Sequence, residues 1–96
     1  SMERVVEKMA HAPADLFRVE ERGYLREGYF ADIVVVDPNA NTEVTKESLL
    51  YKCGWSPFEG ETFKHKIDRT YVNGNCVYAD GKIQSDVSGS RLTFDR

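Results

Sequence analysis

The sequence has no apolar run long enough to cross a membrane, and it is poor in the residues that build disulfide frameworks and metal sites. Its longest apolar run is Ile33–Val36, whereas a helical span needs about 20 residues. No signal-peptide pattern is visible. Only two cysteines and two histidines are present. We therefore expect a cytoplasmic protein with reduced thiols and no membrane partner.

A stripe of positive charge is also missing. The 13 Lys and Arg residues are scattered among 16 Asp and Glu residues, which gives a net charge of −3. A nucleic-acid-binding surface needs clustered basic residues, so we do not expect nucleic acid as a partner. The rest of the composition is that of a globular protein, and 96 residues suffice for one small domain.

Apolar residues at helical spacing open the chain, between residues 5 and 10. Pro13 follows, and proline interrupts helices, so we predict a second short helix over residues 14–17. The first two residues, Ser1-Met2, are typical of an expression-tag remnant. We therefore begin the fold at Glu3.

Strand signals dominate the remainder. The β-branched run from Ile33 to Val36 predicts a strand, and because it does not alternate, both of its faces should be covered. Asn73-Gly74 predicts a β-hairpin between residues 70–72 and 76–78. Asp80-Gly81 predicts a second turn before a returning strand at 82–83.

The other segments are shorter. Thr45 can cap a short helix from 46 to 50. Residues 85–90 are polar and predict a mobile connector, and Leu92 and Phe94 predict a last short strand or a docked tail. The chain is thus predicted to be α+β, with two N-terminal helices, one small internal helix and four to six strands.

A loop rich in glycine, proline and aromatic residues spans Lys52–Gly60. Gly54 and Gly60 allow unusual backbone angles and Pro57 fixes one. Its aromatic residues, Trp55 and Phe58, favour burial. We expect a loop held in one shape and packed onto something large.

Three segments together resemble the C-terminal end of enzymes of the amidohydrolase superfamily. The first is Pro13–Phe17 followed by Gly23–Asp37, and the second is the hairpin Thr70–Tyr78; both would also fit hydantoinases, allantoinases and deacetylases. The third, Ser56-Pro57-Phe58-Glu59-Gly60, is similar to the dihydroorotase branch in particular. One departure is Ala12, where the family often has Asn.

This resemblance implies a zinc-dependent (β/α)8-barrel hydrolase that interconverts N-carbamoyl-L-aspartate and dihydroorotate in pyrimidine biosynthesis. Residues 3–22 would be the last helical segment of the barrel domain, and residues 23–96 part of its C-terminal β-sandwich, with the barrel core absent. The partners would be the missing barrel and the N-terminal strands of the parent chain. A homodimer or strand swap through exposed edges is a further expectation for the chain by itself.

The family's ligands are a His-x-His pair, a carboxylated lysine, two further histidines and an aspartate, and none can be carried over to this chain. We therefore assign no catalytic, cofactor-binding or metal-binding residue and expect the 96 residues alone to be inactive. The alternatives are the equivalent fragment of a hydantoinase or allantoinase and a self-sufficient β-rich binding module. A zinc set made of the four side chains that could bind zinc has no supporting spacing: Cys53, Cys76, His11 and His65.

Three other side-chain sets are candidates for sites. Asp32 and Asp37 lie about 16 Å apart across an extended segment, so we expect them to make turn and strand-end hydrogen bonds rather than to share acid–base work. Trp55 and Phe58 either line a pocket or, as we expect, anchor the loop. Glu59 lacks a nearby nucleophile, so we expect it to pin the loop through a hydrogen bond or ion pair.

Overall fold

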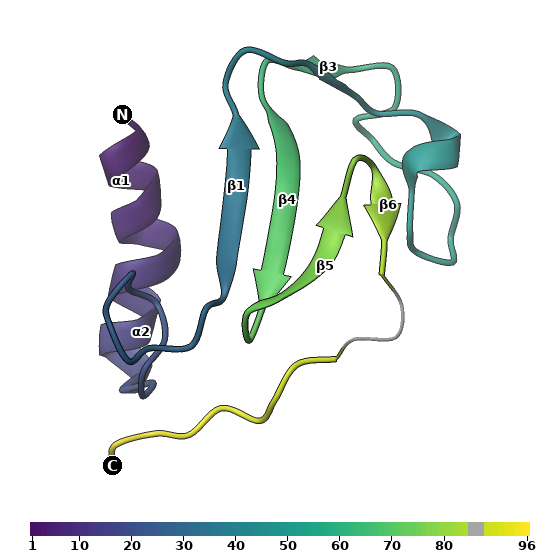
Figure 1. Ribbon diagram of the computed structural model, residues 1–96. Coiled ribbons are helices and arrows are strands. Elements are labelled where there is room, and N and C mark those ends of the chain that lie inside the picture. Colours follow the sequence, from purple (N-terminus) through teal and green to yellow (C-terminus); the bar gives the residue numbers. More distant parts are fainter. Residues whose placement is uncertain (85–87) are drawn as a thin grey trace.

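A computed structural model describes residues 1–84 and 88–96 and shows a small α+β fold with one N-terminal helix and two antiparallel sheets (Figure 1). The larger sheet has the strand order β1-β4-β5-β6, and β2 pairs with β3. The predicted class and strand number are confirmed. The strands are β1 (Ile33–Asp37), β2 (Thr42–Glu43), β3 (Thr62–Phe63), β4 (Lys66–Val72), β5 (Asn75–Ala79) and β6 (Lys82–Ile83).

The prediction of two N-terminal helices is wrong. Segments α1 (Met2–Val6), η1 (Glu7–His11) and α2 (Ala12–Phe17) follow one another without a break. In the π-helical turn η1, the amide of Ala12 donates to the carbonyl of Glu7, five residues back. A proline ring normally crowds the carbonyl four residues before it. The widened turn lies directly before Pro13, which explains how the helix continues through this residue.

The predicted turns are confirmed. Asn73 and Gly74 both have positive φ, as a tight hairpin turn requires, and so do Asp80 and Gly81. Thr45 accepts a hydrogen bond from the amide of Ser48, so the predicted cap exists. The helix that it caps is a single 3₁₀ turn, η2 (Lys46–Ser48), and is shorter than expected.

The end of the chain docks against the segment that follows the helix. Val19 and Phe94 form an antiparallel bridge, and the amide of Glu20 donates to the carbonyl of Thr93 at 2.9 Å. In Figure 1 the yellow C-terminal segment accordingly runs back to the foot of α2. The docked tail is therefore confirmed, whereas the connector expected over 85–90 includes residues 85–87, which lie outside the described part.

The core of the chain is the place where the segment after the helix crosses it. Ala14 and Arg22 are the two buried residues among those described, with 8% and 9% of their surfaces exposed. Gly23 directly follows Arg22 and has φ of +86°. A β-carbon on Gly23 would lie 2.5 Å from the β-carbon of Ala14 and 2.9 Å from the carbonyl oxygen of Ala10. Only glycine permits this close a crossing.

The described residues do not supply the cover that the valine run was expected to have. Val34, Val35 and Val36 are 54%, 40% and 37% exposed. Of the two edges of β1, one pairs with β4 and the other pairs with no strand in the described residues. Within those residues, no helix combines the length and the apolar character that a membrane crossing demands.

Gly23→Ala tests the crossing against a matched control. Gly28 has φ of +87°, and a β-carbon added there would meet no described atom within 4 Å beyond its chain neighbours. Gly28→Ala should therefore cost only the left-handed backbone strain of about 1–2 kcal/mol. Gly23→Ala adds a clash with the helix and should cost about 1–3 kcal/mol more. Chemical denaturation followed by circular dichroism measures both, and equal losses would contradict the account.

Candidate docking surface and its anchoring network

A buried arginine ties the segment after the helix to the sheet. The guanidinium of Arg22 forms an ion pair with Asp32 and donates a 3.3 Å hydrogen bond to the side-chain oxygen of Asn73. Its central carbon lies 4.1 Å from the centre of the Phe30 ring. Its Nη2 atom is buried without a hydrogen-bond partner among the described residues. Burial of Arg22 makes this ion pair a strong constraint, because the guanidinium charge cannot be left unpaired there without a large cost, whereas the Asp32 side chain is 32% exposed.

The same network extends to the hairpin turn and the tail. The second carboxylate oxygen of Asp32 accepts a 2.8 Å hydrogen bond from the backbone amide of Asn73. The side-chain amide of Asn73 donates to the hydroxyl of Ser90 at 2.7 Å, and the amide of Gly74 donates to the carbonyl of Ala31. One network thus joins four segments that are distant in sequence.

The two aspartates that flank β1 have the structural roles expected of them. Asp32 belongs to the arginine network, and the Asp37 carboxylate accepts a 2.9 Å hydrogen bond from the amide of Asn39 in the turn that follows. They make separate contacts at opposite ends of the strand. The expectation of turn and strand-end hydrogen bonding is confirmed.

The cysteines and histidines are placed apart. Cys53 is exposed in the loop and Cys76 is half-buried in β5, whereas the His11 ring stacks on Tyr24 with 4.1 Å between centroids. Across residues 1–84 and 88–96, no group of three or more metal-binding side chains converges. This part of the chain therefore offers no ligand set that fits zinc.

The aromatic loop has the fixed shape that its sequence predicts. The Tyr51 hydroxyl donates to the carbonyl of Trp55 at 2.6 Å, and the amide of Phe58 donates to the hydroxyl of Ser56 at 3.1 Å. The amide of Gly60 donates to the carbonyl of Val44 at 2.8 Å. Backbone bonds such as this one pin the loop; the structure records no side-chain hydrogen bond or ion pair of Glu59 within the described residues, so its expected pinning role finds no support there.

The aromatic side chains of this loop are nevertheless left in solvent. Trp55 is 61% exposed and Phe58 is 55% exposed. Phe58 meets one aromatic neighbour, Phe63, edge to face at 6.1 Å. Exposed aromatic residues on a rigid loop are typical of a docking site.

A second apolar area lies between the helix and the free edge of β1. A hollow of about 270 Å³ is bordered there by Val6 and Ala10 of the helix and by Ile33 and Val34 of the strand, with His11 and Tyr24 among its other lining residues. We call this hollow the apolar groove. We use the name docking surface for three apolar areas that the described residues leave uncovered: the apolar groove, the exposed valines of β1 and the aromatic loop Lys52–Gly60. The helix lies beside β1, and the segment that carries the aromatic loop lies on the other side of the larger sheet (Figure 1).

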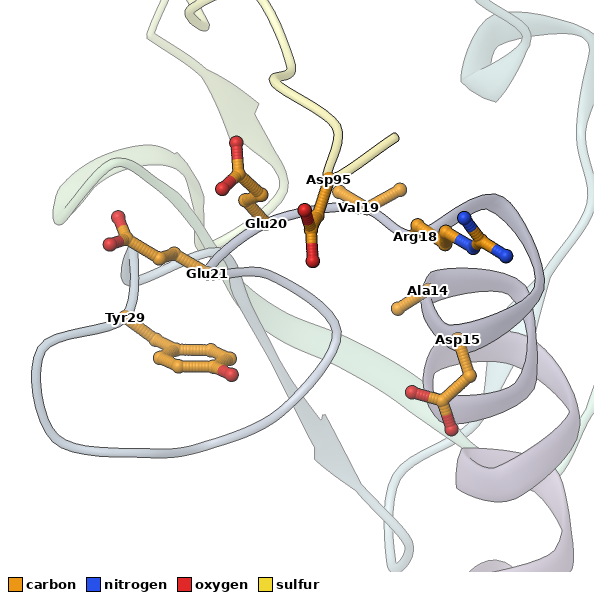
Figure 2. Close-up of a pocket in the computed structure, with 8 residues that line it drawn as sticks. All are labelled: Ala14, Asp15, Arg18, Val19, Glu20, Glu21, Tyr29 and Asp95. Carbon is orange, nitrogen blue, oxygen red and sulfur yellow. The ribbon is translucent and has the colours of Figure 1, made fainter.

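A further hollow of about 430 Å³ is rich in acidic residues (Figure 2). It is open to solvent and is bordered by the end of the helix, the turn after it, Tyr29 and the docked tail. Sequence reasoning missed it, because Asp95 reaches the other lining residues, which lie between 14 and 29, only when the tail docks. Its charged residues are Asp15, Arg18, Glu20, Glu21 and Asp95.

Asp15 also changes the titration of a neighbour. The Tyr24 hydroxyl donates a 2.7 Å hydrogen bond to the Asp15 carboxylate, and this bond, followed by burial, raises the pKa of Tyr24 above its ordinary value of 10.0. Because the neutral phenol is the stabilised form, this contribution is present below pH 10 and is lost as the pH rises through the raised pKa.

Comparison with known proteins reveals relatives that are much longer than this chain. No family model matches. The chain is 43% identical over 91 residues to an allantoinase of Bacillus velezensis, 40% over 78 residues to a dihydroorotase of Endomicrobium trichonymphae and 34% over 88 residues to a dihydroorotase of Pyrococcus abyssi. These matches cover 94%, 81% and 92% of this chain, but 20%, 18% and 22% of the relatives. The chain thus spans about a fifth of the length of the curated relatives that it matches.

Asp32→Asn tests the anchoring network. It leaves the buried Arg22 charge unpaired and should destabilise the fold by about 3–5 kcal/mol. Asp37→Asn, on the exposed turn, should change stability by about 0.5 kcal/mol or less. Thermal unfolding of the two variants measures the difference, and similar melting temperatures would show that the network is not an anchor.

Proposed function

Since the chain is a C-terminal fragment of an amidohydrolase, we propose that it is the structural C-terminal part of a dihydroorotase. The observation that carries this proposal is the uncovered docking surface, because a run of β-branched residues and, separately, the aromatic side chains of a hydrogen-bonded loop are exposed on a chain with two buried residues among those described. Such a surface is built to be covered by something else.

The choice of dihydroorotase rests on the loop Ser56–Gly60, whose sequence is similar to that branch, and on the dihydroorotases among the relatives. The parent enzyme would be a cytoplasmic, zinc-dependent cyclic amide hydrolase of pyrimidine biosynthesis. Zinc would activate the attacking water there. The described residues of this chain do not fit zinc, so we assign them no step of the reaction.

The role proposed for this chain is to hold the enzyme's architecture. The helix, within residues 3–22, would belong to the barrel domain, and residues 23–96 would form part of an accessory β-sandwich. The remaining strands of that sandwich would pair with or cover β1, and Trp55 and Phe58 would pack between sandwich and barrel. The missing four-fifths of the relatives' length gives enough chain for this cover.

Allantoinase is the second candidate function. The allantoinase of Bacillus velezensis has the highest identity of the three relatives compared, at 43%. Both names denote enzymes that act on cyclic amides, so the scaffold role proposed for this chain is the same in either parent. The parent's substrate is what separates the two proposals.

Two chimeric enzymes distinguish the candidates. This chain replaces the matching fifth of the Endomicrobium dihydroorotase in one and of the Bacillus allantoinase in the other. We expect the first chimera to be soluble and to retain dihydroorotate turnover within about tenfold of its host. The second should lose at least about 100-fold of its turnover of allantoin, because in this proposal the docking surface fits a dihydroorotase. Each factor of ten corresponds to about 1.4 kcal/mol of activation free energy.

Each host that carries its own C-terminal fifth is the control for its chimera. The Trp55→Ala version of the active chimera should lose solubility or activity through poorer docking. If only the allantoinase chimera were active, the dihydroorotase proposal would be wrong while the scaffold role would stand. Activity of the separate 96-residue chain on dihydroorotate with added zinc would contradict the scaffold role itself.

The uncovered surface also predicts self-association of the separate chain. A free strand edge with exposed β-branched residues is prone to pair with a second copy. We expect light scattering at about 100 μM to show dimers or larger species, and Val34→Lys/Val36→Lys to restore the monomer. Glu43→Lys, on the small sheet, is the matched control and should change nothing. A monodisperse wild-type monomer at every concentration would support the self-sufficient module instead.

A further inference from the structure

Tyr24 is clamped between two other side chains. The His11 ring stacks on it with ring centroids 4.1 Å apart and planes 9° apart. The guanidinium carbon of Arg26 lies 3.9 Å from the same centroid. Two groups at these distances cannot share one face of the ring, so His11 and Arg26 lie on opposite faces. Both contacts are attractive, because one is aromatic stacking on the Tyr24 ring and the other places a cation over the face of that ring.

The edge of the Tyr24 ring is fixed as well. Its hydroxyl donates a 2.7 Å hydrogen bond to the Asp15 carboxylate. Asp15 and His11 are four residues apart on the helix, so they lie on one helical face. Arg26 in turn donates a 3.4 Å hydrogen bond to the Tyr29 hydroxyl. The helix therefore contacts Tyr24 through His11 and Asp15, and the loop that follows contacts it through Arg26.

Tyr24 lies next to the residue at which the chain crosses the helix. Arg22 and Tyr24 flank Gly23, the residue that crosses the helix at closest approach. Arg22 is bonded to the sheet through Asp32, whereas Tyr24 is bonded to the helix through Asp15. Arg22, Gly23 and Tyr24 thus link the helix to the sheet.

We propose that Tyr24 is the locking residue of a latch, formed with His11, Asp15 and Arg26, that fixes the angle between the N-terminal helix and the sheet. His11 and Tyr24 also line the apolar groove, so the latch sets the width of that groove. This inference does not depend on which enzyme the parent is.

The latch is built to open without unfolding the sheet. Tyr24 is half-buried, in contrast to the buried Arg22. Its partners belong to the helix and to the loop 24–29, and none of those described belongs to a strand. Release of Tyr24 therefore breaks no hydrogen bond between β1, β4 and β5, and it loosens the helix at His11 and Asp15 while the crossing of Gly23 over Ala14 still holds it.

The two histidines of the chain allow a direct test by NMR. A ring stacked on Tyr24 experiences its ring current, so the His11 ring protons should resonate upfield of those of His65, which has no aromatic partner among the described residues. In Tyr24→Leu the upfield displacement should vanish. Tyr24→Phe keeps the ring and should retain it, and this variant preserves the test if the leucine variant fails to fold.

Amide hydrogen exchange reports whether the contact acts as a latch. The amide of Phe30 donates to the carbonyl of Glu21 and closes the loop that carries Tyr24. In Tyr24→Leu we expect this amide to exchange at least about tenfold faster, while amides bonded between β4 and β5 keep their rates. Tyr51→Leu removes an exposed tyrosine that directly precedes the aromatic loop and should leave both Phe30 exchange and the His11 shifts unchanged.

Four results would overturn the proposal. One is a wild-type His11 without upfield displacement, and another is a displacement that persists in Tyr24→Leu. The third is equal acceleration of the Phe30 and β4–β5 amides, since that would make Tyr24 an ordinary contributor to global stability. Loss of the displacement in Tyr24→Phe would likewise count against it, because the ring is still present.

Discussion

The structure depends on one crossing, in which Arg22 and Gly23 pass over the helix against Ala14. The close approach there requires glycine, because a β-carbon would overlap the helix. The buried ion pair of Arg22 with Asp32 then directs the chain into β1, and Asn73 connects the same pair to the β4–β5 turn. Helix, sheet and tail are thus positioned by a small polar centre rather than by a large apolar core.

This design explains why so much apolar surface is exposed. A chain of this length buries little surface by itself, and here the apolar residues point outward from the polar centre. The valines of β1, the apolar groove and the aromatic loop all lie uncovered. In the proposed parent enzyme these areas would provide the packing, and the polar centre would preset the shape that is packed.

Local chemistry made part of this fold predictable. Asn73-Gly74 predicted the hairpin, because few residues tolerate two positive φ angles in succession. Pro13 led to the wrong prediction of two helices, because the widened helical turn before it depends on backbone hydrogen bonding, which no residue type in the sequence indicates. The contacts of Tyr24 and the hollow beside Asp95 depend on tertiary approach, so the sequence carried no local signal for either. The hydrogen-bonded shape of the aromatic loop was predictable from its glycines and proline, whereas the exposure of Trp55 and Phe58 departs from the burial that aromatic side chains favour.

Trp55 is the sole tryptophan of the chain and reports directly on the central claim that this surface is made to be covered. Its fluorescence should be measured in the separate chain and again when the chain is joined to the other four-fifths of a dihydroorotase whose own tryptophans are replaced by phenylalanine. The account predicts solvent-exposed emission in the first case and a blue shift with reduced quenching by iodide in the second. Unchanged emission and quenching in a soluble, active chimera would contradict it.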